Sequence, residues 1–220
     1  MPSRAREKYV IKPMLFILCL LPLNILLWNA FNETLSANPI SDITNETGIW
    51  TLRFLLLSLS ITPIRILTGV TSPVRFRRMI GLFAFFYVCL HFTTYIWLDK
   101  FFDTGEIFRD VAKRKFITVG FSSFVLLIPL AITSSNRIMK ALGGKKWKRL
   151  HRLAYVAGLG GVLHYLWLVK ADLHRPLSYA AILSLLLGIR FWKWFQGRTP
   201  KKSVASATPQ ITFPVEESGN

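Results

Sequence analysis

Long apolar stretches without Asp, Glu, Lys or Arg dominate this chain. A membrane-spanning helix needs about 20 mostly apolar residues, and five stretches approach or reach that length: 13–31, 79–98, 116–136, 153–169 and 176–189. A sixth, residues 50–70, is apolar except for Arg53 and Arg65, which could reach opposite interfaces or face a bundle interior. The first stretch, with Ala37 downstream, could instead be the core of a cleaved signal peptide. The pattern predicts an all-α integral membrane protein, a six-helix transmembrane bundle.

The charges of the connections predict how these helices are oriented, because Lys and Arg concentrate on the cytoplasmic side of membrane proteins. Three segments contain Lys and Arg and no acidic residue apart from Glu7: 1–12, 75–78 and 137–149. The connections between them have no Lys or Arg or mix both signs: 32–49, 99–115 and 170–175. This alternation places both termini in the cytoplasm.

Composition agrees with a membrane protein. The 220 residues are 52% hydrophobic and 18% charged, with a formal net charge of +17 and a mean hydropathy of +0.39. A soluble domain has about 25% charged residues, and a nucleic-acid binder spreads its positive charge over a polar surface. We therefore expect membrane lipid, and no nucleic acid, beside the basic segments. The expected organisation is a basic cytoplasmic N-terminus (1–12), the six-helix domain (13–195) and a disordered cytoplasmic tail (196–220).

Histidines are the chemically distinctive residues of the predicted spans, because all eleven acidic residues fall outside them. Both spans start on the cytoplasmic side, the third near Met79 and the fifth near Leu150, so His91 lies 12 residues in and His164 lies 14 residues in. At a rise of about 1.5 Å per residue, the two depths differ by about 3 Å. Two imidazoles at matching depth can bind one haem iron as axial ligands. The alternative is an ordinary interhelical hydrogen bond from each histidine.

Small residues surround His164 on its helix. The stripe that His164 shares leaves space for a flat ring and consists of Ala154, Ala157, Gly161, His164 and Leu168. Gly158 and Gly160 either add room or serve close helix packing.

His151 is harder to assign. It lies 13 residues before His164, about 20 Å nearer the cytoplasm and about 140° around an ideal helix. The residue 13 before His91 is Arg78, so the partner for a second bis-histidine haem is missing. His151 is expected to be a further iron ligand, a propionate contact, part of a quinone or flavin site, or a headgroup-facing residue. His174 is expected in an exposed loop.

Four segments together resemble a known family. They are GGKKWKRLHRLAYVAGLGGVLHYLWLVK, TGIWTLRFLLLSLSITPIR, RRMIGLFAFFYVCLHFTTYIWLD and KRKFITVGF. They are similar to the MsrQ (YedZ) family, the haem-binding membrane subunits of bacterial periplasmic methionine sulfoxide reductase systems, within the ferric-reductase-like transmembrane group. The similarity covers most of residues 48–195.

The resemblance implies a multi-pass protein of the bacterial inner membrane that is an electron-transfer subunit and not itself the catalyst. It implies haem b, FMN, electrons from the quinone pool, and a periplasmic molybdopterin-containing catalytic partner (MsrP) that reduces methionine sulfoxide in oxidised proteins. The family's histidines fall on His91, His151 and His164, with His91 and His164 as the haem ligands.

Two other functions are compatible with the residues alone. One is a small-solute transporter whose path is lined by histidines, although the spans lack the carboxylates that ion-coupled transport generally uses. The other is a haem-free membrane anchor for a periplasmic enzyme. In the preferred interpretation, the partner docks on the outer connection, on the apolar residues Phe101, Phe102, Ile107 and Phe108.

Overall fold

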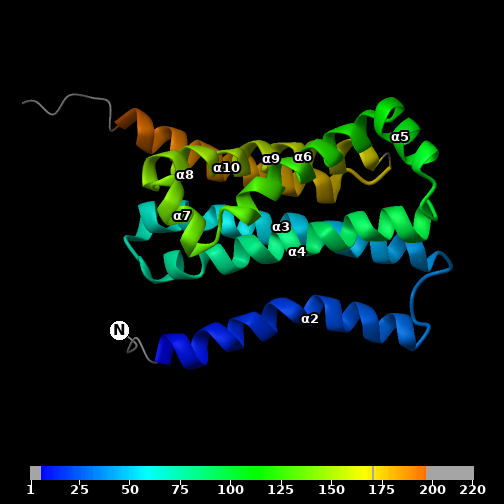
Figure 1. The fold of residues 1–220 in the computed structure, drawn as a ribbon, viewed down its shortest axis with the longest axis horizontal. Coiled ribbons are helices and arrows are strands. Elements are labelled where there is room, and N and C mark those ends of the chain that lie inside the picture. Colours follow the sequence, from blue (N-terminus) through cyan, green and yellow to red (C-terminus); the bar gives the residue numbers. More distant parts are fainter. Residues whose placement is uncertain (1–5, 170, 197–220) are drawn as a thin grey trace, which may run out of the picture.

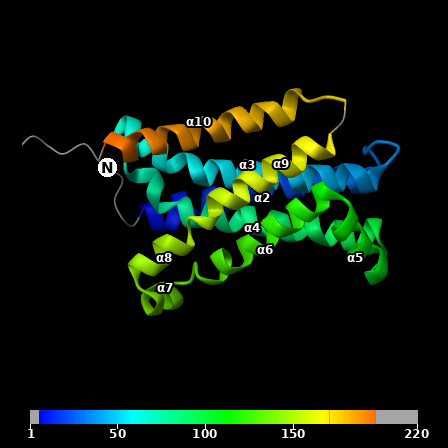
Figure 2. The same cartoon turned by 90° about the horizontal axis from the view of Figure 1, so that it is seen from above.

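The computed structural model describes residues 6–169 and 171–196, and within them every regular element is a helix. Figure 1 shows long helices lying side by side, and Figure 2 shows the same bundle from above. The longer helices are α2 (Lys12–Phe31), α3 (Pro39–Thr68), α4 (Arg77–Thr94), α6 (Lys115–Ile132), α9 (Leu153–Leu168) and α10 (His174–Gln196). The shorter ones are η1 (Glu7–Ile11), η2 (Ser72–Arg75), η3 (Tyr95–Asp99), α5 (Thr104–Lys113), α7 (Asn136–Leu142) and α8 (Gly144–Leu150). Gln196, the first residue of the expected tail, still belongs to α10, and the rest of that tail and the first residues of the basic N-terminus lie outside the described residues.

Among the described residues, four helices are long and apolar enough to cross a membrane: Tyr9–Phe31, Pro39–Thr68, Arg77–Asp99 and Lys115–Ile132. The other two predicted spans are helical as well. α9 has 16 residues, or about 24 Å of rise, somewhat less than a hydrocarbon core of about 30 Å. α10 has 23 residues and carries Arg190 and Lys193 near its end.

The second span begins earlier than predicted. Residues 39–49, expected in a connection, form the first turns of α3, because Asn38 caps the helix by accepting a hydrogen bond from the Ser41 amide and Pro39 occupies the first turn. This corrects the expectation that the spans contain no acidic residue, since Asp42 and Glu46 now lie within α3.

Connections that were expected as loops contain short helices. Asp103 caps α5 by accepting from the amide of Glu106, and Ser135 caps α7 by accepting from the amide of Ile138. The fourth span therefore ends at Ile132 and not at residue 136.

The basic segments gather at one end of the bundle. Figure 1 places the start of α2, the short helices α7 and α8, and the end of α10 at its left, while α5 and the connection between α2 and α3 lie at its right. The helices therefore alternate in direction, as the charges of the connections predict. We call these the α8 end and the α5 end.

The core lies where α3 packs on α4 and α6 packs on α9. Phe54, Phe83 and Tyr87 form an aromatic cluster between α3 and α4, with ring centroids 5.2 Å to 5.9 Å apart. Ala157 of α9 is also buried in this cluster.

The first helix is tied to the bundle by an inserted hydroxyl. Tyr87 of α4 is 1% exposed. Its hydroxyl accepts from the amide of Leu23 (3.1 Å) and donates to the carbonyl of Cys19 (3.0 Å). Those two groups would pair directly in an uninterrupted α-helix, so Tyr87 takes a place in the hydrogen-bond ladder of α2, beside Pro22, which has no amide hydrogen.

An ion cluster fixes the connection between α4 and α5. Lys100 is 8% exposed and lies 2.6 Å from Glu106, 3.0 Å from Asp110 and 3.6 Å from Asp99. Phe101 and Phe102 follow it with φ of 45° and 61°, in the left-handed region that non-glycine residues rarely adopt. Phe101, Phe102 and Phe108 of the expected docking surface are exposed, and Ile107 is half-buried.

Candidate functional site

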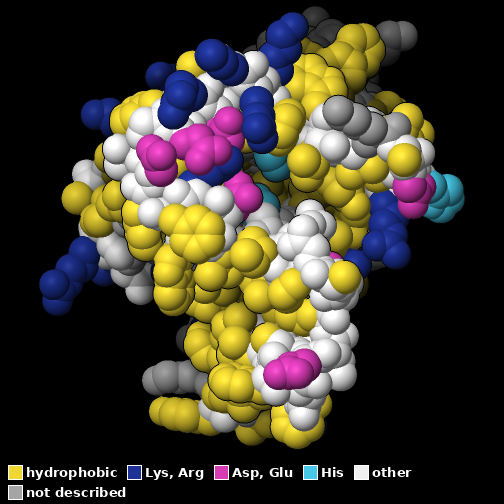
Figure 3. Space-filling model, turned by 90° about the vertical axis from the view of Figure 1, so that its right-hand side faces the viewer, with side chains coloured by type: hydrophobic (Ala, Val, Ile, Leu, Met, Phe, Trp, Pro, Cys, Tyr) yellow, Lys and Arg dark blue, Asp and Glu magenta, His cyan; other side chains and the backbone are white. Residues whose placement is uncertain are grey.

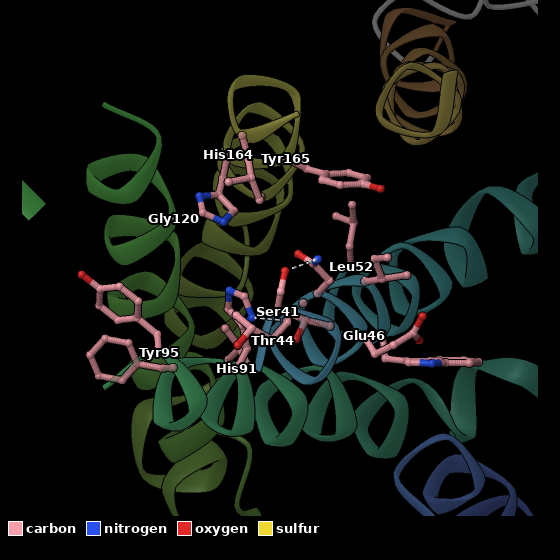
Figure 4. Close-up of a pocket in the computed structure, with 18 of the residues that line it drawn as sticks. Ser41, Thr44, Glu46, Leu52, His91, Tyr95, Gly120, His164 and Tyr165 are labelled. Atoms are coloured by element: carbon pink, nitrogen blue, oxygen red, sulfur yellow. Dashed lines mark hydrogen bonds between the residues drawn. The ribbon is translucent and has the colours of Figure 1, made fainter. Parts of the chain in front are cut away.

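The structure brings His91 and His164 together. His91 comes from α4 and His164 from α9, and their ring centroids are 6.1 Å apart with planes at 77°. Figure 4 shows both rings pointing into the same cavity. Counting residues along the helices predicts a common depth for these two histidines, which are 73 positions apart in the chain. In the structure they meet, as that count predicts.

Each ring is oriented by a backbone carbonyl. His91 Nδ1 lies 2.9 Å from the Thr44 oxygen in α3, and His164 Nδ1 lies 2.7 Å from the Phe116 oxygen in α6. A carbonyl oxygen only accepts, so in both rings Nδ1 carries the hydrogen. The Nε2 lone pair of each neutral imidazole is therefore left for a ligand.

The pair fits a haem iron. A transition-metal bond to imidazole nitrogen is about 2 Å long, so two opposed imidazoles on one metal have ring centres about 6 Å apart. The observed separation is 6.1 Å. Within residues 6–169 and 171–196, no group of three or more His, Cys, Asp or Glu side chains is placed to bind a metal ion, so a tetrahedral zinc site has no ligand set there.

The histidines line a cavity of about 1230 Å³ that opens at the α5 end. Figure 3 looks into this end, where histidine side chains (cyan) lie in a hollow beneath charged residues. Most of the lining comes from α2, α3, α4, α6 and α9, and residues of η3, α5 and the start of α10 complete it. A cavity of this size can accommodate a large planar group.

The small residues of α9 divide between two roles. Ala157, Gly161 and Leu168 line the cavity, as the stripe predicts, whereas Ala154 packs against the core. Gly160 and Gly158 instead serve helix packing: a Cβ on Gly160 would lie 2.1 Å from Ser123 Oγ of α6, and one on Gly158 would lie 3.3 Å from Leu59 of α3.

Three arginines line the cavity wall: Arg53, Arg175 and Arg114, the last of which is paired with Asp110. The Arg53 Nε–H donates to the Tyr179 hydroxyl (3.0 Å), and its guanidinium lies 4.5 Å from the centroid of the Trp50 ring. Arg53 thus lines the cavity while its side chain stays exposed. Arg65, the second arginine of α3, is exposed.

His151 lies apart from this pair, in the turn between α8 and α9. Its ring stacks on Trp147, with centroids 3.9 Å apart. The Thr133 hydroxyl donates to the Pro129 carbonyl (2.6 Å), so His151 Nε2, 3.2 Å from that hydroxyl oxygen, must carry the hydrogen and donate.

The remaining candidates lie away from the cavity. Arg78, at the position of the missing fourth histidine, donates to the Asn136 side chain. His174 is exposed, as expected, and begins α10.

Sequence reasoning missed two glycines. Gly48 of α3 lies under the His91 ring and Gly120 of α6 lies under the His164 ring: a Cβ on either would come within 3.0 Å of the imidazole. The sequence shows that each of these helices has a glycine, but not that the glycine faces a histidine ring.

Comparisons with known proteins identify the family of this chain. A family model described as "Ferric reductase like transmembrane component" matches residues 47–162. The "Protein-methionine-sulfoxide reductase heme-binding subunit MsrQ" of Herminiimonas arsenicoxydans is 52% identical over 202 residues, 90% of this chain and 92% of the relative. Proteins of that name from Polaromonas naphthalenivorans and Rhodospirillum rubrum are 48% and 54% identical, over 88% and 80% of this chain and 91% and 84% of the relatives. No solved structure matches the chain. The chain therefore belongs to the MsrQ family of ferric-reductase-like transmembrane proteins.

Proposed function

We propose that this protein is a membrane haem b subunit that transfers electrons to a periplasmic methionine sulfoxide reductase. The observation that carries the proposal is the histidine pair. Two imidazoles 6.1 Å apart, each with Nδ1 donating to a carbonyl, present the two Nε2 atoms that a six-coordinate haem iron needs. The relatives are named as heme-binding subunits of protein-methionine-sulfoxide reductase.

His91 and His164 would be the axial ligands. When bound, the haem supplies reversible one-electron transfer. The chain's own contribution is to orient both imidazoles, to keep their Nε2 lone pairs free, and to surround the site with apolar walls that limit water. Arg53 and Arg175 offer positive charge to the carboxylates of a porphyrin.

The proposed topology has six spans with both termini in the cytoplasm of a bacterial inner membrane. The alternating helices and the basic α8 end support it, since that end would face the cytoplasm. The cavity would then open toward the periplasm. α9 and α10 would be the two spans beyond the four that length and composition identify.

Electrons would enter from the quinone pool near the α8 end and leave at the α5 end toward a molybdopterin-containing partner. The basic surroundings of His151, with Arg77 and Arg78 nearby, suit an anionic group such as the phosphate of FMN, the second cofactor that the family likeness implies. In this assignment His151 assists electron entry and does not bind the haem iron.

The first test is a visible difference spectrum. The full chain, purified in detergent from haem-replete cells, should give sharp low-spin b-type bands after dithionite reduction. His91→Ala and His164→Ala should each lose them, while the matched control His174→Ala, at an exposed position outside the cavity, should keep them. A colourless wild-type protein, or one whose bands survive both cavity variants, would overturn the proposal.

The second test concerns the partner. We propose that the catalytic subunit docks on Phe101, Phe102, Ile107 and Phe108 at the α5 end. Replacing all four by Ser should slow electron delivery to the oxidised partner without changing the haem spectrum. Phe191→Ser, an exposed apolar position near the end of α10, is the control. Unchanged delivery in the fourfold variant would rule this surface out.

A further inference from the structure

The two histidines are held by the same arrangement, repeated in two helix pairs. In each pair the histidine helix packs on a glycine-bearing helix, α4 on α3 and α9 on α6, and the two helices of each pair run in opposite directions (Figure 1). The accepting carbonyl belongs to the residue four positions before the glycine: Thr44 before Gly48, and Phe116 before Gly120. No internal repeat is evident from the residues themselves, so the repetition is one of geometry.

Helix geometry explains why a glycine occupies this place. Side chains of an α-helix lean toward its N-terminus, so each one covers the surface of the preceding turn. A side chain at position 48 would therefore cover the Thr44 carbonyl. That carbonyl already accepts one hydrogen bond within the helix. Its second lone pair can accept from His91 when the single hydrogen of the Thr47 hydroxyl, 2.9 Å away, goes to the closer Ile43 carbonyl (2.8 Å).

The available space supports the same conclusion. A Cβ on Gly48 would lie 3.0 Å from Nδ1 and Cε1 of His91, and one on Gly120 would lie 2.6 Å from Nδ1 of His164. Ordinary contacts between carbon atoms are about 3.5–4.0 Å. By contrast, a Cβ on Gly188 of α10 would meet nothing within 4 Å. The two cavity glycines are thus in direct contact with the rings.

We propose that Gly48 and Gly120 are matched positioning residues for the axial histidines, which deepens the proposed function and rests on it. Each glycine uncovers one carbonyl, so that the neighbouring imidazole lies against the helix, donates from Nδ1 and keeps Nε2 free toward the cavity. The iron ligands are therefore set by the backbones of α3 and α6 before any metal is present.

The first test reads the hydrogen position without haem. The chain has four histidines, so nitrogen-15 labelling of histidine in the full chain from haem-depleted cells gives a small, assignable NMR spectrum. His91 and His164 should carry the hydrogen on Nδ1, and His151, which donates from Nε2, serves as an internal contrast. Nε2–H tautomers at His91 and His164 would overturn the proposal.

The second test replaces the glycines. Haemin titration of the haem-free chain should show affinity reduced about 10- to 100-fold in Gly48→Ala and Gly120→Ala, the usual range when a partner of a ligating histidine is lost. Gly120→Ala should have the larger effect because its contact is closer, and it should shift the spectrum toward high spin. Gly188→Ala should bind like wild type. Wild-type affinity and spin state in both cavity variants would overturn the proposal.

A double-mutant comparison separates positioning from simple misfolding. Gly120→Ala should lower the thermal unfolding midpoint of the haem-free chain, but much less so in a His164→Ala background, where the new methyl occupies space that the ring has left. An equal loss in both backgrounds would mean that Gly120 acts through helix packing, and would overturn its positioning role.

The outcomes also distinguish this proposal from the proposed function. Nδ1–H tautomers in a chain that takes up no haemin would overturn the haem function and leave the orienting role of the glycines standing. Normal haem uptake with Nε2–H tautomers would do the reverse.

Discussion

At the α5 end, His91 and His164 face one cavity, each with Nδ1 bonded to a helix carbonyl. At the α8 end, His151 lies in a turn, with its ring stacked on Trp147 and its Nε2 engaged with the Thr133 side chain. The first two rings are oriented by backbone and present a free Nε2, whereas the third is oriented by side chains and has its Nε2 occupied.

This contrast indicates what a buried histidine needs in order to act as a metal ligand. Depth alone is insufficient, because a ligand also needs a fixed tautomer and an opposed partner. His91 and His164 satisfy both conditions. His151 has a fixed tautomer, but its Nε2 carries the hydrogen, and the position that could hold a second imidazole is occupied by Arg78, which is bonded to Asn136.

The largest expected effect comes from the ion cluster at the α5 end. Lys100→Met would leave Asp110, whose side chain is 10% exposed, without its main counter-charge, and breaking a buried pair costs about 3–5 kcal/mol. Amides of α5 should then exchange hydrogen much faster. Lys113→Met, on the exposed face of the same helix, should change stability by less than about 0.5 kcal/mol. Equal exchange in both variants would show that the cluster does not stabilise this end.

The same cluster has a defined pH dependence. Although burial raises the pKa of Asp110, the hydrogen bond from Lys100 and the charges of Lys100 and Arg114 lower it overall, below its usual 3.8. A carboxyl whose folded pKa is depressed stabilises the fold above its unfolded pKa and loses that contribution as pH falls through the folded value. Protection of α5 should therefore be full at neutral pH and decline below about pH 4. Asp110→Asn should abolish that decline.

The next largest effect is expected at the α8 end. Trp147→Ala removes the ring stacked on His151 and the hydrogen bond from its indole to the Thr133 carbonyl, and should cost about 2 kcal/mol for a half-buried ring. The haem spectrum should be unchanged, because the histidine pair is held by other helices. The exposed Trp192→Ala is the control. Loss of the low-spin bands in Trp147→Ala would show that the two ends are coupled.

A smaller effect is expected from Tyr87→Phe. Without the hydroxyl, the Leu23 amide and Cys19 carbonyl lose their shared partner. Hydrogen bonds between membrane helices contribute about 0.6 kcal/mol on average and up to about 1.7 kcal/mol, so we expect a loss of about 1 kcal/mol in unfolding free energy. Faster amide exchange should be confined to α2 around Leu23. Wild-type exchange there would show that α2 is held by apolar packing alone.

The smallest spectral effect is expected from His151→Ala. If only His91 and His164 bind the iron, this variant should keep the haem content and low-spin bands of the wild type, while electron entry from quinol slows. Loss of about half the haem would contradict the contrast between the α5 end and the α8 end, because it would make His151 a ligand of a second haem.

Much of the fold could be predicted, because the apolar stretches and the charges of the connections can be read directly along the sequence. The meeting of His91 and His164 could also be predicted, since the constant rise of a helix converts residue count into depth. The early start of α3 was missed although Asn38, Pro39 and Asp42 form a recognisable N-terminal signal. Asp103 and Glu106 give a similar signal for α5.

Other features could not be predicted from one sequence. Whether Gly48 lies under a ring or in lipid depends on the rotation of α3 about its axis, and glycine is common in spans for packing alone. The insertion of Tyr87 into α2 depends on how far α2 and α4 slide along each other. Both depend on how one helix is placed against another, and the hydrophobic periodicity of a sequence does not contain that information.

The repeated arrangement of histidine and glycine has a consequence for biosynthesis. The chain leaves the ribosome from its N-terminus, so the unit of α3 and α4 can form, with its ring already oriented, before α6 and α9 have been made. Each unit is complete without the other, and joining them creates the cavity. A protein made as two fragments divided after Lys113, so that α5 stays with the first, should therefore reassemble in the membrane and recover haem. Fragments that pair without recovering haem would show that the two units are oriented only within a continuous chain.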